Sequence, residues 1–142
     1  MDSVADILEQ ETQSTIENWL RRIDADSLLI NTPVAEHARA SHLPELFSEL
    51  VHRLRNPLPL GARALMSPAA AAHGHLRLQQ GYTAAMLVEE SRILQVSIFQ
   101  TLHQNSDRLD FTSLLPDVMA IADEVDSQLA QAMTSYTYGN RT

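Results

Sequence analysis

The chain of 142 residues is 44% hydrophobic and 20% charged, with a formal net charge of −8, a balance that fits one soluble globular domain with a single core. Its ten cationic residues are all arginine and form no phosphate-binding cluster, cysteine is absent, and no apolar run reaches the roughly 20 residues that span a bilayer. We therefore expect a cytoplasmic protein with no nucleic-acid partner and no membrane partner.

Helix is favoured almost throughout, because alanine, leucine, glutamate and glutamine are abundant and no β-branched residues alternate with polar ones over the length of a strand. Ser3 and Asp6 have the spacing of a capping box, which predicts a first helix from Val4. That helix carries an apolar stripe in which Trp19 is expected to anchor the core. The stripe consists of Ile7, Leu8, Ile16, Trp19, Leu20 and Ile23.

Two further helices are predicted before residue 56. Thr32 and Pro33 offer a cap and a first-turn proline for a short helix that ends near Ala40. The next helix ends near Arg55 and has apolar residues at positions i, i+3, i+4 and i+7. Its apolar positions are Leu43, Leu46, Phe47, Leu50, Val51 and Leu54, and the residues expected to point away from them are Glu45, Glu49, His52 and Arg53.

Residues 56–61 form the one clear linker. Pro57 and Pro59 each remove a backbone donor and force an extended conformation on the preceding residue, so a helix cannot continue through them. The leucines at positions 58, 60 and 65 predict that this linker lies against the body of the domain.

The stretch from residue 67 to residue 102 is predicted to be an antiparallel pair of helices. Ser67 can cap the first helix, and Pro68 suits its first turn because proline lacks an N–H. Gly81 suits the left-handed residue that follows a helix, and Thr83 can cap the second helix.

The last helix is expected to begin near Asp110 or Ser113, and its apolar residues alternate in spacings of four and three. They are Phe111, Leu115, Val118, Ala122, Val125, Leu129, Ala132 and Tyr136. We call this set the heptad seam, and it predicts a dimer seam or an output helix, with two alanines that let another helix approach closely. The alternative is that the seam closes the intramolecular bundle, with Leu114 and Ile121 as a second apolar flank.

Polar residues of the paired helices are the candidate functional site. His73 and Arg77 are four residues apart and point from one face of the first helix, opposite Glu89 and Glu90 on the second. Such a cluster can receive an anionic ligand, or it can fix the packing of the two helices and respond to pH. The alternative is a set of partly solvated salt bridges that sets the helix register.

Catalytic and metal chemistry have little support in the sequence. His73 and His75 are two residues apart and diverge by about 200° on a helix, and no two histidines on one predicted helix are four residues apart. The chain has no nucleophile elbow and no glycine-rich phosphate loop. We therefore expect no enzyme activity, no metal and no cofactor.

A set of residues in and around the paired helices forms a longer pattern, which comprises His73-Gly74, Arg77, Gln80-Gly81-Tyr82, Leu87-Val88, Glu90, Arg92, Leu94 and Ile98. This pattern resembles the signature of the RsbRD N-terminal sensor domain family, of the RsbT co-antagonist type. Trp19 and the segment from His42 to Leu46 support the resemblance, which covers nearly the whole chain. The chain departs from the pattern at Ser91, where a larger residue is expected.

The resemblance implies a single-domain bundle of five to six helices, globin-like, paired as a homodimer. It implies a bacterial input domain for signal transduction, which precedes a histidine kinase of a two-component system or a stressosome-type regulator of the stress response in the same polypeptide. Residues 1–109 are then the sensor bundle, and residues 110–142 are a signalling and dimerisation helix packed on it. The implied ligand-binding or switch cluster is His73, Arg77, Tyr82, Glu90 and Arg92.

Two alternatives stay open beside the sensor hypothesis. The chain could be a protein-interaction scaffold that binds no small molecule, in which case the polar cluster only maintains the fold. It could also be a haem or gas sensor, because a globin-like arrangement needs a single axial histidine. A pocket lined by the cluster would favour a sensor, whereas solvated or mutually satisfied polar groups would favour a scaffold.

Overall fold

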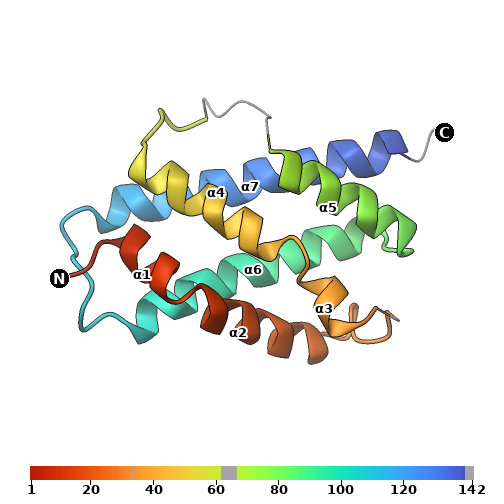
Figure 1. Ribbon diagram of the computed structural model, residues 1–142, viewed down its shortest axis with the longest axis horizontal. Coiled ribbons are helices and arrows are strands. Elements are labelled where there is room, and N and C mark those ends of the chain that lie inside the picture. Colours follow the sequence, from red (N-terminus) through yellow and green to blue (C-terminus); the bar gives the residue numbers. More distant parts are fainter. Residues whose placement is uncertain (33, 62–66, 140–142) are drawn as a thin grey trace.

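The computed structural model describes residues 1–32, 34–61 and 67–139, and these residues form an all-α bundle (Figure 1). The predicted all-α fold with a long C-terminal helix is confirmed. No strand occurs in the described ranges, although Asp2 and Leu109 form one isolated bridge. The helices are α1 (Val4–Gln10), α2 (Thr12–Asp24), α3 (Glu36–Arg39), α4 (Leu43–Arg55), α5 (Pro68–Gln79), α6 (Ala84–Gln104) and α7 (Leu114–Gly139).

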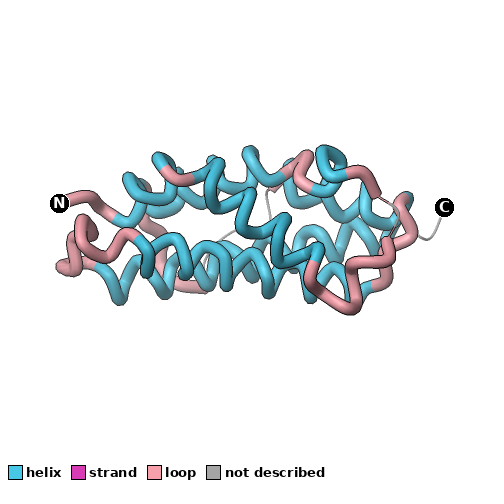
Figure 2. The backbone as a smooth tube through the Cα atoms, turned by 90° about the horizontal axis from the view of Figure 1, so that it is seen from below, coloured by secondary structure: helices cyan, strands magenta, loops and turns pink. Residues whose placement is uncertain are grey.

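The two longest helices, α6 and α7, run along the long axis of the molecule, and the loops gather mainly at its two ends (Figures 1 and 2). Helix α2 packs on α6, α5 packs on α7, and α4 packs on both α1 and α7. Trp19 is buried in this core, as its position in the stripe predicts. Within the described residues, no helix combines the length and the hydropathy that crossing a membrane requires.

The predicted first helix is two helices, which corrects the sequence-based expectation. Its capping box is confirmed, because the Ser3 hydroxyl accepts a bond from the Asp6 N–H at 3.0 Å and the Asp6 carboxylate accepts one from the Ser3 N–H at 3.3 Å. The helical run breaks at Glu11. Next to the break, the Thr12 hydroxyl donates to the Leu8 carbonyl at 2.9 Å, and this kind of bond bends helices.

Helix α4 buries all six residues of its predicted apolar stripe. The expectation that Arg53 points away from this stripe is wrong, because its side chain is buried against α7. Its guanidinium lies 2.8 Å from the Asp123 carboxylate and 3.3 Å from the Glu124 carboxylate. A cation is buried at such a position because the facing helix supplies carboxylates that compensate for its lost hydration.

The linker after α4 does not bury its leucines. Leu58 and Leu60 are both exposed, contrary to expectation, and Leu65 lies outside the described residues, as does Pro33. The linker is attached by a polar contact instead, in which the Gly61 N–H donates to the Asp123 carboxylate at 3.2 Å.

The predicted caps of α5 and α6 are confirmed. The Ser67 hydroxyl accepts a bond from the Ala70 N–H at 3.0 Å, and the Thr83 hydroxyl accepts one from the Met86 N–H at 3.2 Å. Gly81 has a φ of +82°, which is the left-handed conformation that the sequence predicts. We refer to residues 80–83, which join α5 to α6, as the Gly81 corner.

Helix α5 packs mainly against α7 rather than along α6, which corrects the picture of a closely paired hairpin. The two helices diverge from the Gly81 corner (Figure 1). The cause is a close crossing at Gly74, where a Cβ atom would lie only 2.0 Å from the Ala132 carbonyl oxygen. The absence of a side chain at Gly74 therefore lets α5 contact the backbone of α7 directly.

The heptad seam divides into two halves. In the C-terminal half, Val125 and Ala132 are buried, and Leu129 and Tyr136 are half-buried against the bundle. The N-terminal half is less covered, with Val118 and Ala122 half-buried. There, Phe111 is 57% exposed and Leu115 is 69% exposed. The seam thus closes the intramolecular bundle at one end and leaves an apolar strip open at the other.

Candidate functional site

Arg77 is the centre of a buried polar cluster and is 0% exposed. Its Nε donates to both carboxylate oxygens of Glu90 at 3.2 Å, its Nη1 donates to the Gln80 amide oxygen at 2.7 Å, and its Nη2 donates to the Arg39 carbonyl at 2.5 Å. The guanidinium carbon also lies 4.6 Å from the centre of the Tyr82 ring. Each nitrogen of the guanidinium thus has a protein acceptor, so an anionic ligand would have to displace one of them.

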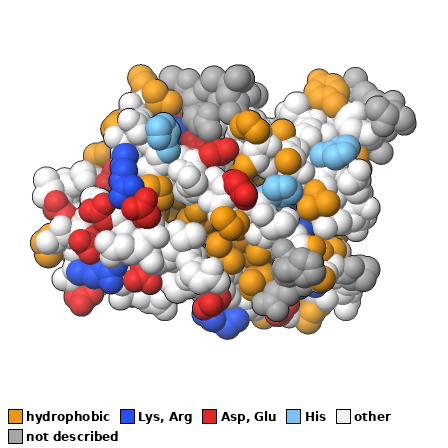
Figure 3. All heavy atoms as spheres, viewed as in Figure 1, with side chains coloured by type: hydrophobic (Ala, Val, Ile, Leu, Met, Phe, Trp, Pro, Cys, Tyr) orange, Lys and Arg blue, Asp and Glu red, His pale blue; other side chains and the backbone are white. Residues whose placement is uncertain are grey.

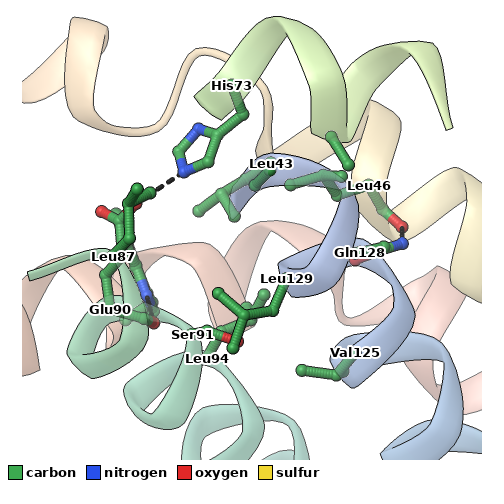
Figure 4. A pocket seen from close by; sticks show the side chains of 13 residues that line it. Leu43, Leu46, His73, Leu87, Glu90, Ser91, Leu94, Val125, Gln128 and Leu129 are labelled. Atoms are coloured by element: carbon green, nitrogen blue, oxygen red, sulfur yellow. Dashed lines mark hydrogen bonds and ion pairs between the residues drawn. The ribbon is translucent and has the colours of Figure 1, made fainter. Parts of the chain in front are cut away.

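Glu90 is 4% exposed and joins three helices. His73 and Arg77 of α5 both contact its carboxylate. The Glu90 Oε1 atom lies 2.6 Å from Nε2 of His73 (Figure 4), and the carboxylate also accepts a hydrogen bond from Arg77. Its backbone carbonyl accepts a bond from the Trp19 indole N–H of α2 at 3.1 Å. The predicted proximity of His73, Arg77 and Glu90 is confirmed, and we call these residues with Tyr82 the Glu90 cluster.

Arg92 lies outside this cluster, contrary to expectation. Its side chain is 60% exposed and binds Glu89, with its Nε 2.7 Å from the carboxylate. This pairing is the largest cause that lowers the pKa of Glu89 to about 2. Residues two positions apart on a helix diverge by about 200°, so Arg92 and Glu90 point to different sides of α6.

Tyr82 connects the Glu90 cluster to the end of α7. Its ring is buried beside Arg77, and burial raises the pKa of its phenol. Its backbone carbonyl accepts a hydrogen bond from the Tyr136 hydroxyl at 2.7 Å. A displacement of the Gly81 corner would therefore act directly on the last turns of α7.

A second histidine lies next to the cluster. The His42 ring packs edge-to-face on the His73 ring, with centroids 5.6 Å apart, and Nδ1 of each ring is buried without a hydrogen-bond partner in the described part of the chain. Burial is the largest cause that lowers the pKa of His42. The neighbouring His73 and Arg77 also lower it, and Glu45 raises it. No group of three or more histidine or carboxylate side chains that could hold a metal occurs among the described residues.

This environment predicts a stability loss on mild acidification. Because the pKa of His42 in the folded state lies below its ordinary value of 6.5, the unfolded state takes up the proton first, and stability falls as the pH drops below about 6.5. The urea midpoint should decrease between about pH 7 and about pH 5.5, and His42→Gln should flatten that decrease. An equal decrease in His42→Gln and in the exposed control His75→Gln would contradict the assignment.

A cavity of about 40 Å³ adjoins the Glu90 cluster, between α4, α5, α6 and α7 (Figure 4). His73 and Glu90 line one side, and Trp19 of α2 lies against it. The rest of the lining is mainly aliphatic and consists of Leu43, Leu46, Ala70, Leu87, Ser91, Leu94, Val125, Gln128, Leu129 and Ala132.

A second polar network, between α4 and α7, was not predicted from the sequence. Besides the Arg53 ion pairs, the Gln128 amide group donates to the Leu46 carbonyl at 3.1 Å and to Glu124 at 3.2 Å. Gln131 accepts a bond from the Ser67 N–H. The available signal was the row formed by positions 124, 128 and 131, which has helical spacing and lies about 100° around α7 from the heptad seam.

Charged and apolar side chains are distributed unevenly over the surface. Figure 3 shows acidic and basic side chains gathered at the end of the molecule that holds α1, and hydrophobic ones more frequent toward α3 and α5. The charged end contains the exposed pairs of Arg55 with Asp6 and Glu9. These exposed pairs connect α1 to α4 and lie apart from the Glu90 cluster.

Comparison of the chain with protein-family models, with curated proteins and with solved structures gives no match. The resemblance to the RsbRD N-terminal sensor domain family therefore stays a prediction.

Proposed function

We propose that the chain is a cytoplasmic sensory input domain of a bacterial signal-transduction protein and that it transmits through α7. The output partner in this proposal is a histidine kinase or a stressosome-type regulator in the same polypeptide. The observation that carries the proposal is the hydrogen bond from Tyr136 to Tyr82, because it joins the end of the long helix to the Glu90 cluster.

The physical basis is that buried ion pairs have strict geometric requirements. Arg77 and Glu90 are stable in the interior only while their hydrogen bonds are complete, so a displacement of either is costly. A signal that alters the packing around Glu90 would favour an alternative position of the Gly81 corner. Tyr82 would transfer that change to α7. The signal would thereby shift an equilibrium between two conformations of the domain.

The test is a mutation that removes only the hydrogen bond between Tyr136 and Tyr82. Tyr136→Phe removes one hydroxyl and should shift the balance between signalling states by about two- to ten-fold, which is the worth of one hydrogen bond. Kinase or regulator output of the full-length protein is the measurement. Thr134→Val is the control, since within the described residues the Thr134 hydroxyl bonds only the Ala130 carbonyl of the same helix, at 2.8 Å. Equal output from both variants and the wild type would contradict the proposal.

Homodimer formation is the second part of the proposal. Leu115 and Met119 are one helical turn apart at the start of α7 and are 69% and 45% exposed, and Phe111, which precedes α7, is 57% exposed, so this end of α7 presents exposed apolar side chains. We expect sedimentation to show a dimer and Leu115→Glu to weaken it by about ten-fold or more, because the variant places a charge in an apolar interface. Leu58→Glu, at another exposed leucine, should leave the dimer intact. A strict monomer at high concentration would contradict dimerisation.

The alternative function is an interaction scaffold without a small-molecule ligand. The complete hydrogen bonding of Arg77 favours it, because a satisfied cluster can serve the fold alone. The cavity beside Glu90 favours the sensor instead. A scaffold would keep its partner binding in Tyr136→Phe, whereas the sensor would change its output.

A further inference from the structure

The short segment that joins α3 to α4 contacts α5 beside the Glu90 cluster, and we call residues 39–43 the α3–α4 junction. The Arg39 carbonyl accepts a hydrogen bond from Arg77, and the His42 ring packs on the His73 ring. His42 is the N-cap residue of α4, and its side chain makes no capping bond. The first turn of α4 therefore lacks the side-chain acceptor that commonly stabilises a helix start. Such a segment can open locally while the rest of the fold stays intact.

A proton on His42 is incompatible with the packed junction. The Nδ1 atom of His42 is buried and has no hydrogen-bond partner in the described part of the chain. Both ring nitrogens of a protonated histidine carry a hydrogen, so Nδ1 would become a buried donor without an acceptor. The ring also lies at the N-terminus of α4, where the helix dipole disfavours a positive charge. Movement of His42 away from α5 would expose both N–H groups to water.

The groups that face His42 from α5 and α6 do not compensate for such a charge. His73 contacts the ring edge-to-face, and the positive charge of Arg77 repels a proton on it. Glu90 supplies the buried carboxylate of this region, but that carboxylate is already bound to both His73 and Arg77 (Figure 4). A protonated His42 would therefore add a second full positive charge beside a single carboxylate.

The groups on α3 and α4 give little compensation either. The guanidinium of Arg39, at the end of α3, is paired with Asp24 at 2.9 Å. On α4, the negative charge of Glu45 favours a proton on His42, but Glu45 is exposed and its effect is outweighed by burial of the ring. The closed junction thus favours a neutral His42.

We propose that uptake of a proton by His42 releases the α3–α4 junction from α5, so that a fall in pH is the signal that the domain detects. Release takes the Arg39 carbonyl away from Arg77, and the buried guanidinium loses one of its acceptors. The same guanidinium packs on the ring of Tyr82, the residue that binds the end of α7. The role of acid as a signal rests on the proposed function; the release of the junction does not.

Hydrogen exchange of the purified protein at about pH 7 and about pH 5.5 measures the release. After correction for the intrinsic pH dependence of amide exchange, protection in residues 39–46 should fall by about eight-fold. That factor is expected when one group with the ordinary histidine pKa of about 6.5 takes up a proton only in the released state. Residues 39–46 should stay less protected than residues 121–128 at both pH values. Low concentrations of urea should hardly change their exchange, because local release exposes little surface.

Two variants of His42 identify the group that takes up the proton. His42→Phe keeps an aromatic ring against His73 and has no nitrogen to protonate, so protection in residues 39–46 should no longer depend on pH. His42→Gln also takes up no proton, and it decides the matter if the phenylalanine variant does not fold. The matched control is His75→Gln, at an exposed position of α5, which should keep the response of the wild type.

An equal response to pH in the wild type and in His42→Gln would overturn the inference, as would protection in the wild type that does not change with pH. Protection in residues 39–46 as high as in residues 121–128 at about pH 5.5 would also overturn it, because the junction would then open only when the whole chain unfolds. Release without a change in output of the full-length protein would leave the inference standing and count against the proposed function. Altered output in Tyr136→Phe with a junction that does not respond to pH would do the reverse.

Discussion

Replacing Arg77 with methionine is expected to lower the free energy of unfolding by about 3–5 kcal/mol, because the variant leaves the Glu90 carboxylate buried without its cation. Methionine retains most of the apolar part of the arginine side chain. The loss of stability would therefore come from the missing positive charge and not from a new cavity. Urea denaturation measures it. Arg92→Met, which removes the exposed cation beside Glu89, should have a much smaller effect.

The double variant Arg77→Met with Glu90→Leu sharpens this test. If the loss in the single variant comes from an unpaired buried carboxylate, removal of that carboxylate should recover part of the stability. A single-variant loss under about 1 kcal/mol would show that Glu90 is compensated by His73 alone and that Arg77 is not central to the cluster.

Gly74→Ala is expected to destabilise the protein by about 1–3 kcal/mol, although the same change in an exposed helix would stabilise it by about 1 kcal/mol. The new Cβ would lie 2.0 Å from the Ala132 carbonyl oxygen, and a backbone atom cannot move aside without separating α5 from α7. Ala72→Gly at an exposed position of α5 is the matched control and should cost about 1 kcal/mol. Thermal unfolding measures the stability of both variants. A Gly74→Ala variant that is more stable than the wild type would contradict the close crossing.

Features set by local spacing were predictable from the sequence. The caps at Ser3, Ser67 and Thr83 each depend on residues within three positions, and all three form as predicted. The stripe of α4 is equally local. The break at Glu11 was not predictable from periodicity, because the apolar stripe continues through it. The Thr12 hydroxyl marks the bend, with bonds to the Leu8 carbonyl at 2.9 Å and the Glu9 carbonyl at 3.1 Å.

Features that depend on distant partners were not predictable. The sequence pattern of α4 predicts that Arg53 is a surface residue. The fold buries it because Glu124, 71 positions later in the chain, lies opposite it. The bond from Arg77 to the Arg39 carbonyl is another example, since nothing in the spacing places α3 beside α5. The exclusion of Arg92, by contrast, follows from the same 200° argument that separates His73 from His75.

The heptad seam shows why one pattern supported two interpretations. Ala132 lies where α5 crosses α7 and belongs to the intramolecular core, whereas Leu115 is exposed and is available to a partner. Periodicity records that a face is apolar along its whole length. It does not record where along that length the rest of the chain covers it.

The central claim is that the Glu90 cluster holds the end of α7 through Tyr82, and hydrogen exchange on Tyr136→Phe tests it most directly. Exchange should become faster in residues 129–139 and in the Gly81 corner, and it should stay unchanged over residues 114–125 and in Thr134→Val. Protection that is unchanged in Tyr136→Phe, or lost evenly along α7, would contradict the claim.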